Sequence, residues 1–201
     1  MSKKIIAIVG TYRKGHTTDS AVDLLLNSAQ SLGAETEKIF LLDRHIEFCT
    51  NCRSCTQKQI DGLRGKCVHN DDMEAILDKV DLADAIVLAS PVNWFNVTAL
   101  MKRFIERLTC YGYWPWGIGI PKNRIKKLTK KAVLITSSSA PALFGRVFYP
   151  GTLFVLKAAA NCVGAKVVRK IYIGGVAVEK DQPLPEKYRK QICAAGKALA
   201  R

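Results

Sequence analysis

The first residues suited to binding chemistry are the polar side chains of one short loop, 10–18. Its candidate ligand-binding residues are Thr11, Arg13, His16, Thr17 and Thr18. The apolar run before it, 5–9, predicts a buried strand, and Thr17 and Thr18 are candidate N-caps of a following helix. Between a strand and a helix N-terminus, backbone N–H groups and the helix dipole favour an anion, and hydroxyl groups add donors. We therefore predict that this loop binds phosphate; an ordinary strand-to-helix turn is the alternative.

The type of phosphate follows from what the loop lacks. The spacing of its glycines is close to that of a Walker A loop, but His16 stands where a lysine should face the β- and γ-phosphates. The apolar run 85–89 ends in Ser90 and Pro91 instead of the carboxylate of a Walker B strand. The loop also lacks the G-x-G-x-x-G of a dinucleotide fold. A single terminal phosphate is therefore favoured, and a nucleotide-triphosphate-binding switch is the alternative.

Four of the seven cysteines form a second cluster of chemically active residues. They are Cys49, Cys52, Cys55 and Cys67. Three thiols in one short loop, with a fourth further on, are typical of iron–sulfur ligation, while zinc binding and free thiols are alternatives. The odd total argues against a disulfide framework. The remaining cysteines, 110, 162 and 193, lie in apolar surroundings and are predicted to be small core residues.

Composition limits the class of protein. The 201 residues suffice for one domain with a sizeable core, since 48% are hydrophobic. Neither a secretory signal nor a membrane-spanning stretch is visible, so we expect a cytoplasmic protein without a membrane partner. The net charge of +14 includes a basic block without acidic residues, 122–131. Because no nucleic-acid-binding motif is present, we expect the block to be a solvated face.

Strand and helix signals alternate along the whole chain. Apolar runs predict strands at 5–9, 35–42, 84–90, 131–137 and 165–174. Helical periodicity predicts helices at 17–31, 70–80, 97–110, 151–163 and 183–201. This alternation is typical of a doubly wound, five-stranded parallel sheet in an α/β protein. We expect a single domain, 1–201, interrupted by a cysteine-rich loop, 43–70, and an aromatic and basic insertion, 111–130.

In such a sheet, ligands bind beyond the carboxyl ends of the strands. This rule gathers three loops: 10–18, 90–96 and 136–141. The second contributes backbone amides, a proline bend and aromatic side chains, and the third contributes hydroxyl groups. Together they predict a pocket for a flat heteroaromatic ring attached to a phosphate. Its further binding residues would be Pro91, Val92, Asn93, Trp94, Phe95, Ser137 and Ser138.

The order of these motifs resembles that of the flavodoxin-fold NAD(P)H-dependent FMN reductases and, among them, the iron–sulfur flavoproteins. The family's phosphate loop commonly reads G-S-P-R-K-G-x-N-T, its flavin-ring loop reads S-P-V-Y, and its cysteine-rich segment is followed by D-D-M. The corresponding stretches here are 10–18, 90–93 and 49–73. The chain departs from the pattern at Tyr12, Thr17 and Asn93, which replace proline, asparagine and an aromatic residue.

The resemblance implies a flavodoxin-like sheet of order 2-1-3-4-5 that binds FMN. The phosphate would lie on loop 11–18, with Arg13 among its donors. Backbone N–H groups of 92–96 would face the pyrimidine edge of the ring, and Trp94 or Phe95 would cover it. NAD(P)H would be the electron donor, and a quinone, a flavin or another small molecule the acceptor. The flavin performs the hydride chemistry, so the resemblance implies no catalytic side chain.

The cluster-bearing members of this family imply a [4Fe–4S] cluster on the four cysteines. Their last gap is shorter than the eleven residues found here, and the extra residues, with Gly62 and Gly65, could loop out without moving Cys67. Such a protein would exchange electrons with a ferredoxin docked on the block 122–131. A non-catalytic flavodoxin-like shuttle is the alternative. Family members usually dimerise, so we expect a homodimer or homotetramer, with the aromatic stretch 111–116 as a flavin lid or as an interface.

Overall fold

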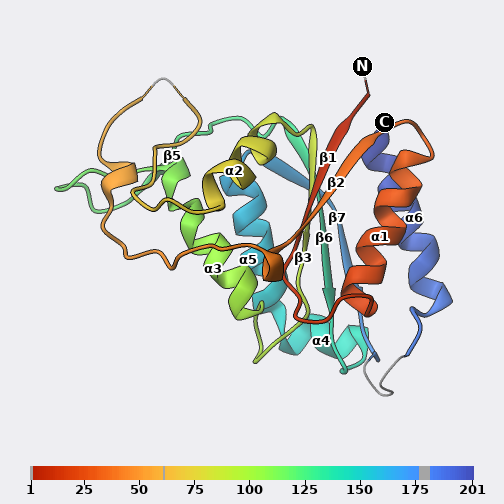
Figure 1. Ribbon diagram of the computed structural model, residues 1–201. Helices are drawn as coiled ribbons and strands as arrows, with labels where there is room; N and C mark the ends of the chain where they lie inside the picture. The colour runs from red at the N-terminus through yellow and green to blue at the C-terminus, as the bar shows by residue number, and fades with distance from the viewer. Residues whose placement is uncertain (1, 61, 177–181) are drawn as a thin grey trace.

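A parallel β-sheet lies at the centre of the computed structural model, which describes residues 2–60, 62–176 and 182–201 (Figure 1). Its order is β2-β1-β3-β6-β7, and each neighbouring pair is parallel. The strands are β1 (Lys4–Val9), β2 (Glu35–Phe40), β3 (Ala85–Ala89), β6 (Lys130–Ser137) and β7 (Ala165–Ile173). Numbered within this sheet, the order is 2-1-3-4-5, so the predicted flavodoxin-like α/β fold is confirmed.

The central strands are apolar because both of their faces are covered. Strand β3 reads AIVLA, and all of its residues are buried. A strand covered on both faces carries apolar residues throughout instead of alternating with polar ones. In β1, Ile6 and Ile8 pack into one core cluster, while Ile5 and Val9 pack into the other. The sheet therefore separates two hydrophobic cores.

Helices cover the two faces of the sheet (Figure 1). Helices α1 (Thr17–Gln30) and α6 (Glu186–Ala200) pack on one face. The other face is covered by α2 (Met73–Leu82), α3 (Ala99–Arg107) and α5 (Pro150–Cys162), and α4 (Ala142–Phe148) lies near the carboxyl ends of the strands. A Cβ atom on Gly196 would lie 2.2 Å from the carbonyl oxygen of Leu25, so glycine permits the close packing of α6 on α1.

Short elements occupy the two segments outside the regular alternation. The described residues include the short 3₁₀ helices η1 (Leu41–Asp43), η2 (Ser54–Thr56) and η3 (Leu108–Tyr111). Strands β4 (Gly112–Tyr113) and β5 (Lys122–Asn123) pair antiparallel within the aromatic and basic insertion. The insertion thus forms a small hairpin beside the main sheet.

Several element boundaries differ from the expected ones for local reasons. Helix α3 begins two residues late because the hydroxyl of Thr98 accepts a hydrogen bond from Met101 N (3.1 Å), as an N-cap does. The second strand ends at Phe40, immediately before η1, and α2 begins at Met73. The short helix α4 was not expected from the sequence.

Across the residues that the structure describes, we find no helix whose length and apolar character would let it cross a membrane.

Candidate functional site

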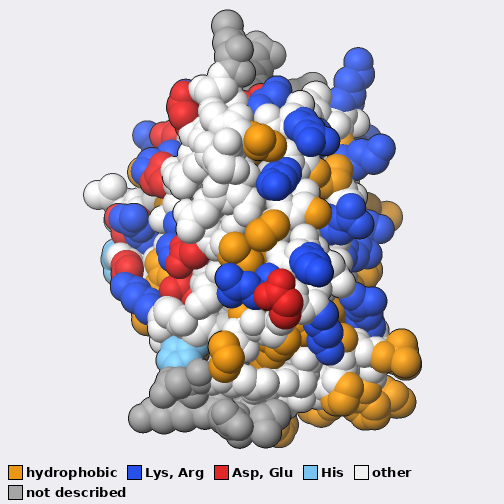
Figure 2. Space-filling model, turned by 90° about the vertical axis from the view of Figure 1, so that its right-hand side faces the viewer, with side chains coloured by type: hydrophobic (Ala, Val, Ile, Leu, Met, Phe, Trp, Pro, Cys, Tyr) orange, Lys and Arg blue, Asp and Glu red, His pale blue; other side chains and the backbone are white. Residues whose placement is uncertain are grey.

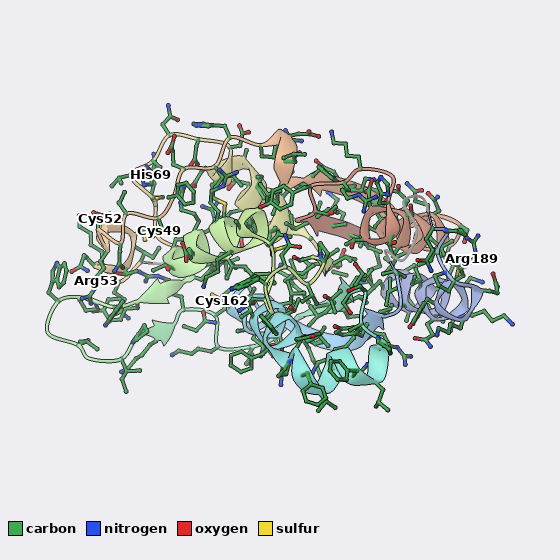
Figure 3. The ribbon with its side chains drawn as sticks, turned by 90° about the horizontal axis from the view of Figure 1, so that it is seen from below. Cys49, Cys52, Arg53, His69, Cys162 and Arg189 are labelled. Carbon is green, nitrogen blue, oxygen red and sulfur yellow. The ribbon has the colours of Figure 1, made fainter. Side chains whose placement is uncertain are left out.

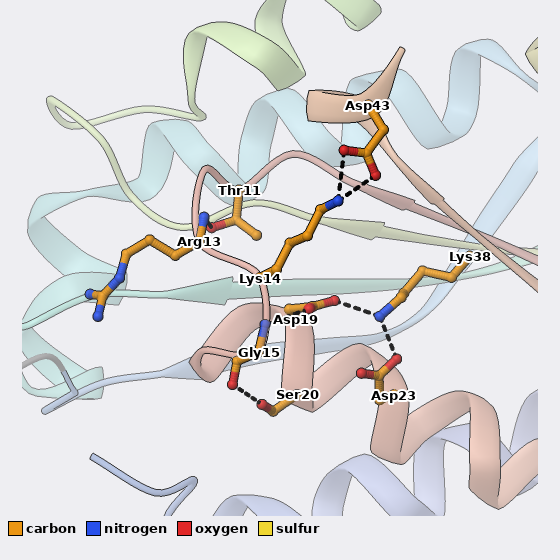
Figure 4. A network of polar contacts seen from close by, with 9 residues as sticks. All are labelled: Thr11, Arg13, Lys14, Gly15, Asp19, Ser20, Asp23, Lys38 and Asp43. Carbon is orange, nitrogen blue, oxygen red and sulfur yellow. Dashed lines mark hydrogen bonds and ion pairs between the residues drawn. The ribbon is translucent and has the colours of Figure 1, made fainter. Parts of the chain in front are cut away.

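The loop after β1 is closed by hydrogen bonds to its own backbone (Figure 4). Gly15 has a φ of +75°, a left-handed conformation that favours glycine. Its N–H donates to Asp19 Oδ2 (2.7 Å), and its carbonyl oxygen accepts a bond from Ser20 Oγ (2.8 Å). The N-cap position of α1 is His16, without a side-chain capping bond, so the expected capping by Thr17 or Thr18 is wrong.

The lysines near this loop are paired with carboxylates (Figure 4). Lys14 Nζ lies 2.6 Å from Asp43 Oδ2. Lys38 Nζ lies 2.7 Å from Asp19 Oδ1 and 2.6 Å from an oxygen of Asp23. These pairs position the start of α1 against β2. The guanidinium of Arg13 lies instead beside His16, with Nη2 2.8 Å from Nδ1.

A pocket of about 410 Å³ lies where the three predicted loops meet. The loops are joined by Thr18 Oγ1 and Ser137 Oγ at 2.8 Å and by a bond from Val92 N to Ser137 O (2.8 Å). Ten of the twelve residues predicted to bind the cofactor line the pocket, and Trp94 and Phe95 do not. The lining is Thr11, Tyr12, Arg13, His16, Thr17, Thr18, Pro91, Val92, Asn93, Ser137, Ser138, Ser139 and Val176.

Three of these lining residues, Tyr12, Ser139 and Val176, were not predicted. Tyr12 lies in loop 10–18 and Ser139 in loop 136–141, and the sequence predicts that both loops form the pocket. Including every residue of these loops would therefore have identified both. Val176 follows β7, and the rule that ligands lie beyond the carboxyl ends of parallel strands would have included it.

Trp94 and Phe95 form the tip of a tight turn outside the pocket. Asn93 N donates to Asn96 O (2.8 Å), and Asn96 N donates to Asn93 O (3.0 Å). The φ angles of Trp94 and Phe95 are +45° and +65°, the left-handed conformations of a type I′ turn, which are unfavourable for bulky side chains. Of the backbone N–H groups of 92–96 that are expected to face the flavin ring, those of Val92, Asn93 and Asn96 already bond within the protein, and the expected contact with the ring stays a prediction.

The turn continues into an exposed aromatic and apolar surface. Phe95 lies edge-on to Tyr149 at 5.1 Å between ring centroids, and Phe144 stacks on Phe148 at 4.1 Å. Hydrophobic side chains gather at the lower end of the face drawn in Figure 2, where Figure 1 places α4. The exposed large side chains of this apolar surface are Trp94, Phe95, Leu143, Phe144, Val147 and Phe148.

One buried arginine joins both ends of the cysteine-rich segment, 43–70, to α3. The side chains of Arg107 and Asp71 are 2% and 1% exposed, and Arg107 Nη1 lies 2.5 Å from Asp71 Oδ2. Arg107 also donates to Glu47 O (2.9 Å), and Asp71 accepts from Glu47 N (2.7 Å). Burial alone would lower the pKa of Arg107, but the hydrogen bond to Asp71 and the charge of Cys67 raise it overall. The pair therefore remains ionised.

The return of the segment toward Cys67 is fixed by Arg64 and Gly65. Arg64, 9% exposed, pairs with carboxylates of α2: Glu74 (2.7 Å), Asp78 and Asp81 (2.8 Å). A Cβ atom on Gly65 would lie 1.9 Å from the carbonyl oxygen of Cys55. Only glycine therefore allows the backbone at position 65 to lie this close to the backbone of Cys55. The chain before Cys67 therefore passes directly against Cys55, and the expectation that the additional residues of the last gap loop out stays a prediction.

The aromatic insertion packs against the cysteine-rich segment of the same chain. The guanidinium of Arg53 lies between the rings of Trp114 (3.7 Å) and Trp116 (4.1 Å). Trp114 N donates to Thr56 O (2.9 Å), and Arg53 donates to Trp114 O (2.7 Å). Figure 3 shows Cys49, Cys52, Arg53 and His69 together at one end of the molecule. The aromatic stretch, expected as a flavin lid or as an interface, thus packs on the cysteine-rich segment of its own chain.

The basic block is only partly a solvated face. Lys130 Nζ donates to Asp81 O (2.6 Å) and Ala83 O, and Arg124 donates to Lys58 O (2.9 Å). Lys122, Lys126 and Lys127 are exposed. Lysine and arginine side chains also spread over the face that Figure 2 presents, so the positive charge is not confined to this block.

The thiols of the cysteine-rich segment differ in exposure: Cys52 is exposed, whereas Cys49, Cys55 and Cys67 are partly buried. Burial raises the pKa of Cys55 to about 11, and the neighbouring Cys67, Cys49 and Cys52 contribute. Among the residues described, no three His, Cys, Asp or Glu side chains are grouped as a metal ion would require. In a [4Fe–4S] cluster the four thiolates bind different irons, so their sulfurs need not converge on one ion.

Several unpartnered buried nitrogens belong to residues of this segment or to residues that contact it. Seven buried side-chain N or O atoms of the described residues lack a hydrogen-bond partner. Five are nitrogens of Arg53, His69, Arg103, Arg107 and Arg124. Arg53 and His69 belong to the segment itself. The other three residues contact it: Arg107 donates to Glu47 O, Arg124 donates to Cys55 O, and the guanidinium of Arg103 lies over the Phe48 ring. Buried donors without acceptors suit an anionic group such as a thiolate-bound cluster, so the residues present fit one.

Residues 3–173 match the family model described as NADPH-dependent FMN reductase. The match covers most of the chain, which therefore belongs to this family. The resemblance inferred from the three loop motifs is confirmed.

Curated relatives include iron–sulfur flavoproteins. One from Archaeoglobus fulgidus is 38% identical over 56% of this chain and 48% of its own length. One from Methanosarcina thermophila is 32% identical over 52% of this chain and 51% of its own length. The chain thus matches about half the length of these relatives.

Solved structures share the fold over the whole chain. An FMN-dependent NADH-azoreductase from Bacillus anthracis, in complex with FMN, aligns with a TM-score of 0.72 at 18% identity, covering 99% of this chain and 100% of that one. An NAD(P)H:quinone oxidoreductase from Methanothermobacter marburgensis aligns with a TM-score of 0.70 at 15% identity, with the same coverage. At these identities the likeness supports the fold.

We expect Lys38→Met to lower the free energy of unfolding by about 1–3 kcal/mol, because it leaves the buried Asp19 carboxylate without its cation. Burial lowers the pKa of Lys38, but its hydrogen bonds to the carboxylates of Asp19 and Asp23 raise that pKa overall above the ordinary lysine value. The ion pair of Lys38 therefore stabilises the fold fully at pH values below the ordinary lysine pKa. This stabilisation is lost as the pH rises through the raised pKa that Lys38 has in the folded protein. Urea unfolding between pH 7 and 11 measures both effects.

Asp23→Asn is the control, because Asp23 is 48% exposed and its loss should change the free energy of unfolding by less than about 1 kcal/mol. A difference between wild type and Lys38→Met that stayed constant up to pH 11 would contradict the assignment.

Proposed function

We propose that the chain is an oxidoreductase that binds FMN in the 410 Å³ pocket and passes electrons from NAD(P)H to a small acceptor, such as a quinone or a flavin. The observation that carries the proposal is the meeting of a cationic and hydroxyl-rich loop with two further loops at the carboxyl ends of β1, β3 and β6. Membership in the FMN reductase family supports it.

The pocket residues divide into a phosphate end and a ring end. At the phosphate end, Arg13 and the hydroxyl groups of Thr11 and Thr17 would bind the phosphate near the N-terminus of α1. At the ring end, the backbone N–H groups of Val92 and Asn93 are already bonded, so side chains such as Asn93 would supply polar contacts. FMN, when bound, supplies the hydride chemistry, and the chain's residues bind and orient it.

Removing the cation of the phosphate end tests this arrangement. We expect Arg13→Ala to raise the Kd for FMN about 10- to 100-fold, since a hydrogen bond to a charged group contributes about 1.5–3 kcal/mol. Riboflavin, which lacks the phosphate, should bind wild type and variant equally. Arg44→Ala, an exposed cation outside the pocket, is the matched control. Equal losses for FMN and riboflavin would contradict the assignment, and bound FMN that NAD(P)H fails to bleach would favour the electron-shuttle alternative.

We further propose that Cys49, Cys52, Cys55 and Cys67 hold a [4Fe–4S] cluster that exchanges electrons with a ferredoxin-like carrier. The unpartnered nitrogens around the segment and the iron–sulfur flavoproteins among the relatives support the cluster. The exposed lysines 122, 126 and 127 lie on or follow the hairpin that packs against the segment, and they would attract an acidic carrier.

Metal analysis of anaerobically purified protein tests the cluster. We expect about four irons per chain together with stoichiometric FMN. Cys52→Ser should lose most of the iron and retain FMN, whereas Cys193→Ser, on α6, should retain both. Bound zinc, or flavin without iron under these conditions, would contradict the cluster. Reduction by a carrier at a rate independent of salt would contradict docking on the lysines.

We also propose that the apolar surface around α4 is covered by a second copy in a homodimer or homotetramer. Its aromatic and aliphatic side chains form a contiguous exposed patch beside the pocket, and such patches commonly mark interfaces. We expect Leu143→Glu, at a site 80% exposed, to shift sedimentation equilibrium toward the monomer. Leu82→Glu, 75% exposed on α2, should not. A monomeric wild type, or equal behaviour of the two variants, would contradict this interface.

A further inference from the structure

A second pocket, of about 420 Å³, lies between the C-terminal ends of α3 and α5 and the hairpin of β4 and β5. Among the described residues, none lines both this pocket and the one proposed for FMN. Helix α3 separates the two pockets. Its N-cap, Thr98, donates from its N–H to Ser90 Oγ (3.1 Å) in loop 90–96, whereas Leu108, just after its last turn, lines the second pocket. A molecule in the second pocket would therefore lie away from the flavin.

Hydrogen bonds hold the walls of the second pocket in place. Asn123, on β5, donates through Nδ2 to Cys162 O (3.1 Å) at the end of α5. Trp114, which follows β4, donates from its N–H to Thr56 O (2.9 Å). All four of these residues line the pocket. Because these contacts already order the walls, little free energy of binding would be spent on ordering them.

The lining of the second pocket favours an apolar ligand with one negative charge. Pockets of this size that bind small molecules are commonly lined by hydrophobic side chains and a few polar groups. Polar side chains of the lining already donate to protein acceptors, as Thr109 Oγ1 does to Glu106 O (2.8 Å). Among the described residues that line it, Lys122 alone is charged; it is exposed, and its Nζ has no hydrogen-bond or ion-pair partner within the described part of the chain.

We propose that the second pocket binds an apolar carboxylate, a molecule with a hydrocarbon body and one carboxylate group. The body would lie against Leu108 and Ala159, and the carboxylate would pair with Lys122 Nζ. Burial raises the pKa of the Cys162 thiol to about 11, so this side chain adds no negative charge to the pocket at neutral pH. The site goes beyond the proposed function, because it takes no part in binding FMN.

Calorimetric titration of the full chain with decanoate, in saturating FMN, tests the proposal, and decan-1-ol is the uncharged counterpart of decanoate. Ala158→Phe places a ring in the pocket from an exposed position on α5. Ala194→Phe, exposed on α6 and outside the lining, is its matched control. Lys122→Gln removes the cation, and Lys126→Gln, exposed in the same basic block but outside the lining, is the second control.

We expect Ala158→Phe to raise the Kd for decanoate by about tenfold or more, because the added ring occupies the volume that the hydrocarbon body needs. Lys122→Gln should raise that Kd by about 2- to 5-fold, as an exposed ion pair allows, and should leave the Kd for decan-1-ol unchanged. Both control variants should match wild type.

A wild type that does not bind decanoate would overturn the proposal, and so would equal affinities of wild type and folded Ala158→Phe. Equal effects of Lys122→Gln on decanoate and decan-1-ol would overturn it as well, since the carboxylate would then have no cation. Lys122→Gln changes an exposed side chain, so it tests the proposal even if Ala158→Phe does not fold.

Discussion

Helix α3 is hydrogen-bonded at both ends to the two candidate sites, and the rest of the functional geometry depends on this constraint. At its start, Thr98 Oγ1 donates to Gly10 O (2.6 Å), and a Cβ atom on Gly10 would lie 2.7 Å from Met101 Cβ. At its end, Arg107 bonds the segment that carries the cysteines. Nine helical residues span about 14 Å, so one rigid element sets the separation of the two sites.

Several acidic residues of this basic chain form ion pairs and hydrogen bonds that hold the two candidate sites in place. Asp19 holds Gly15 and Lys38, Asp71 holds Arg107, and three carboxylates of α2 hold Arg64. These ion pairs and hydrogen bonds fix the loop after β1 and the described ends of the cysteine-rich segment. Under the proposed function, a phosphate would bind at the first and a thiolate-bound cluster at the second, and cationic neighbours suit both anionic groups.

The fold could be predicted from the sequence because strand burial has a direct compositional signature. An entirely apolar run such as AIVLA in β3 indicates a strand that is buried on both faces. Parallel strands then place all of their carboxyl ends at the same edge of the sheet, where ligands bind. Most of the pocket follows from these two facts. The outward position of Trp94 and Phe95 could not be predicted, since it arises from a left-handed turn that aromatic residues rarely adopt. The packing of the insertion on the cysteines also depends on contacts between residues distant in sequence.

This packing has a thermodynamic consequence for the cysteine-rich segment. In small metal-binding domains the ligand loop is disordered without metal, so binding must also supply the free energy of folding. Here Arg53 between two tryptophans, the buried Arg107 pair and the Arg64 cluster order the loop through contacts that need no metal. If the segment binds a cluster as proposed, less of the free energy of binding would be spent on ordering the loop, and more would remain for affinity. The insertion would then also support the segment that carries the thiols, a role not among the two considered from its aromatic composition, a flavin lid or an interface.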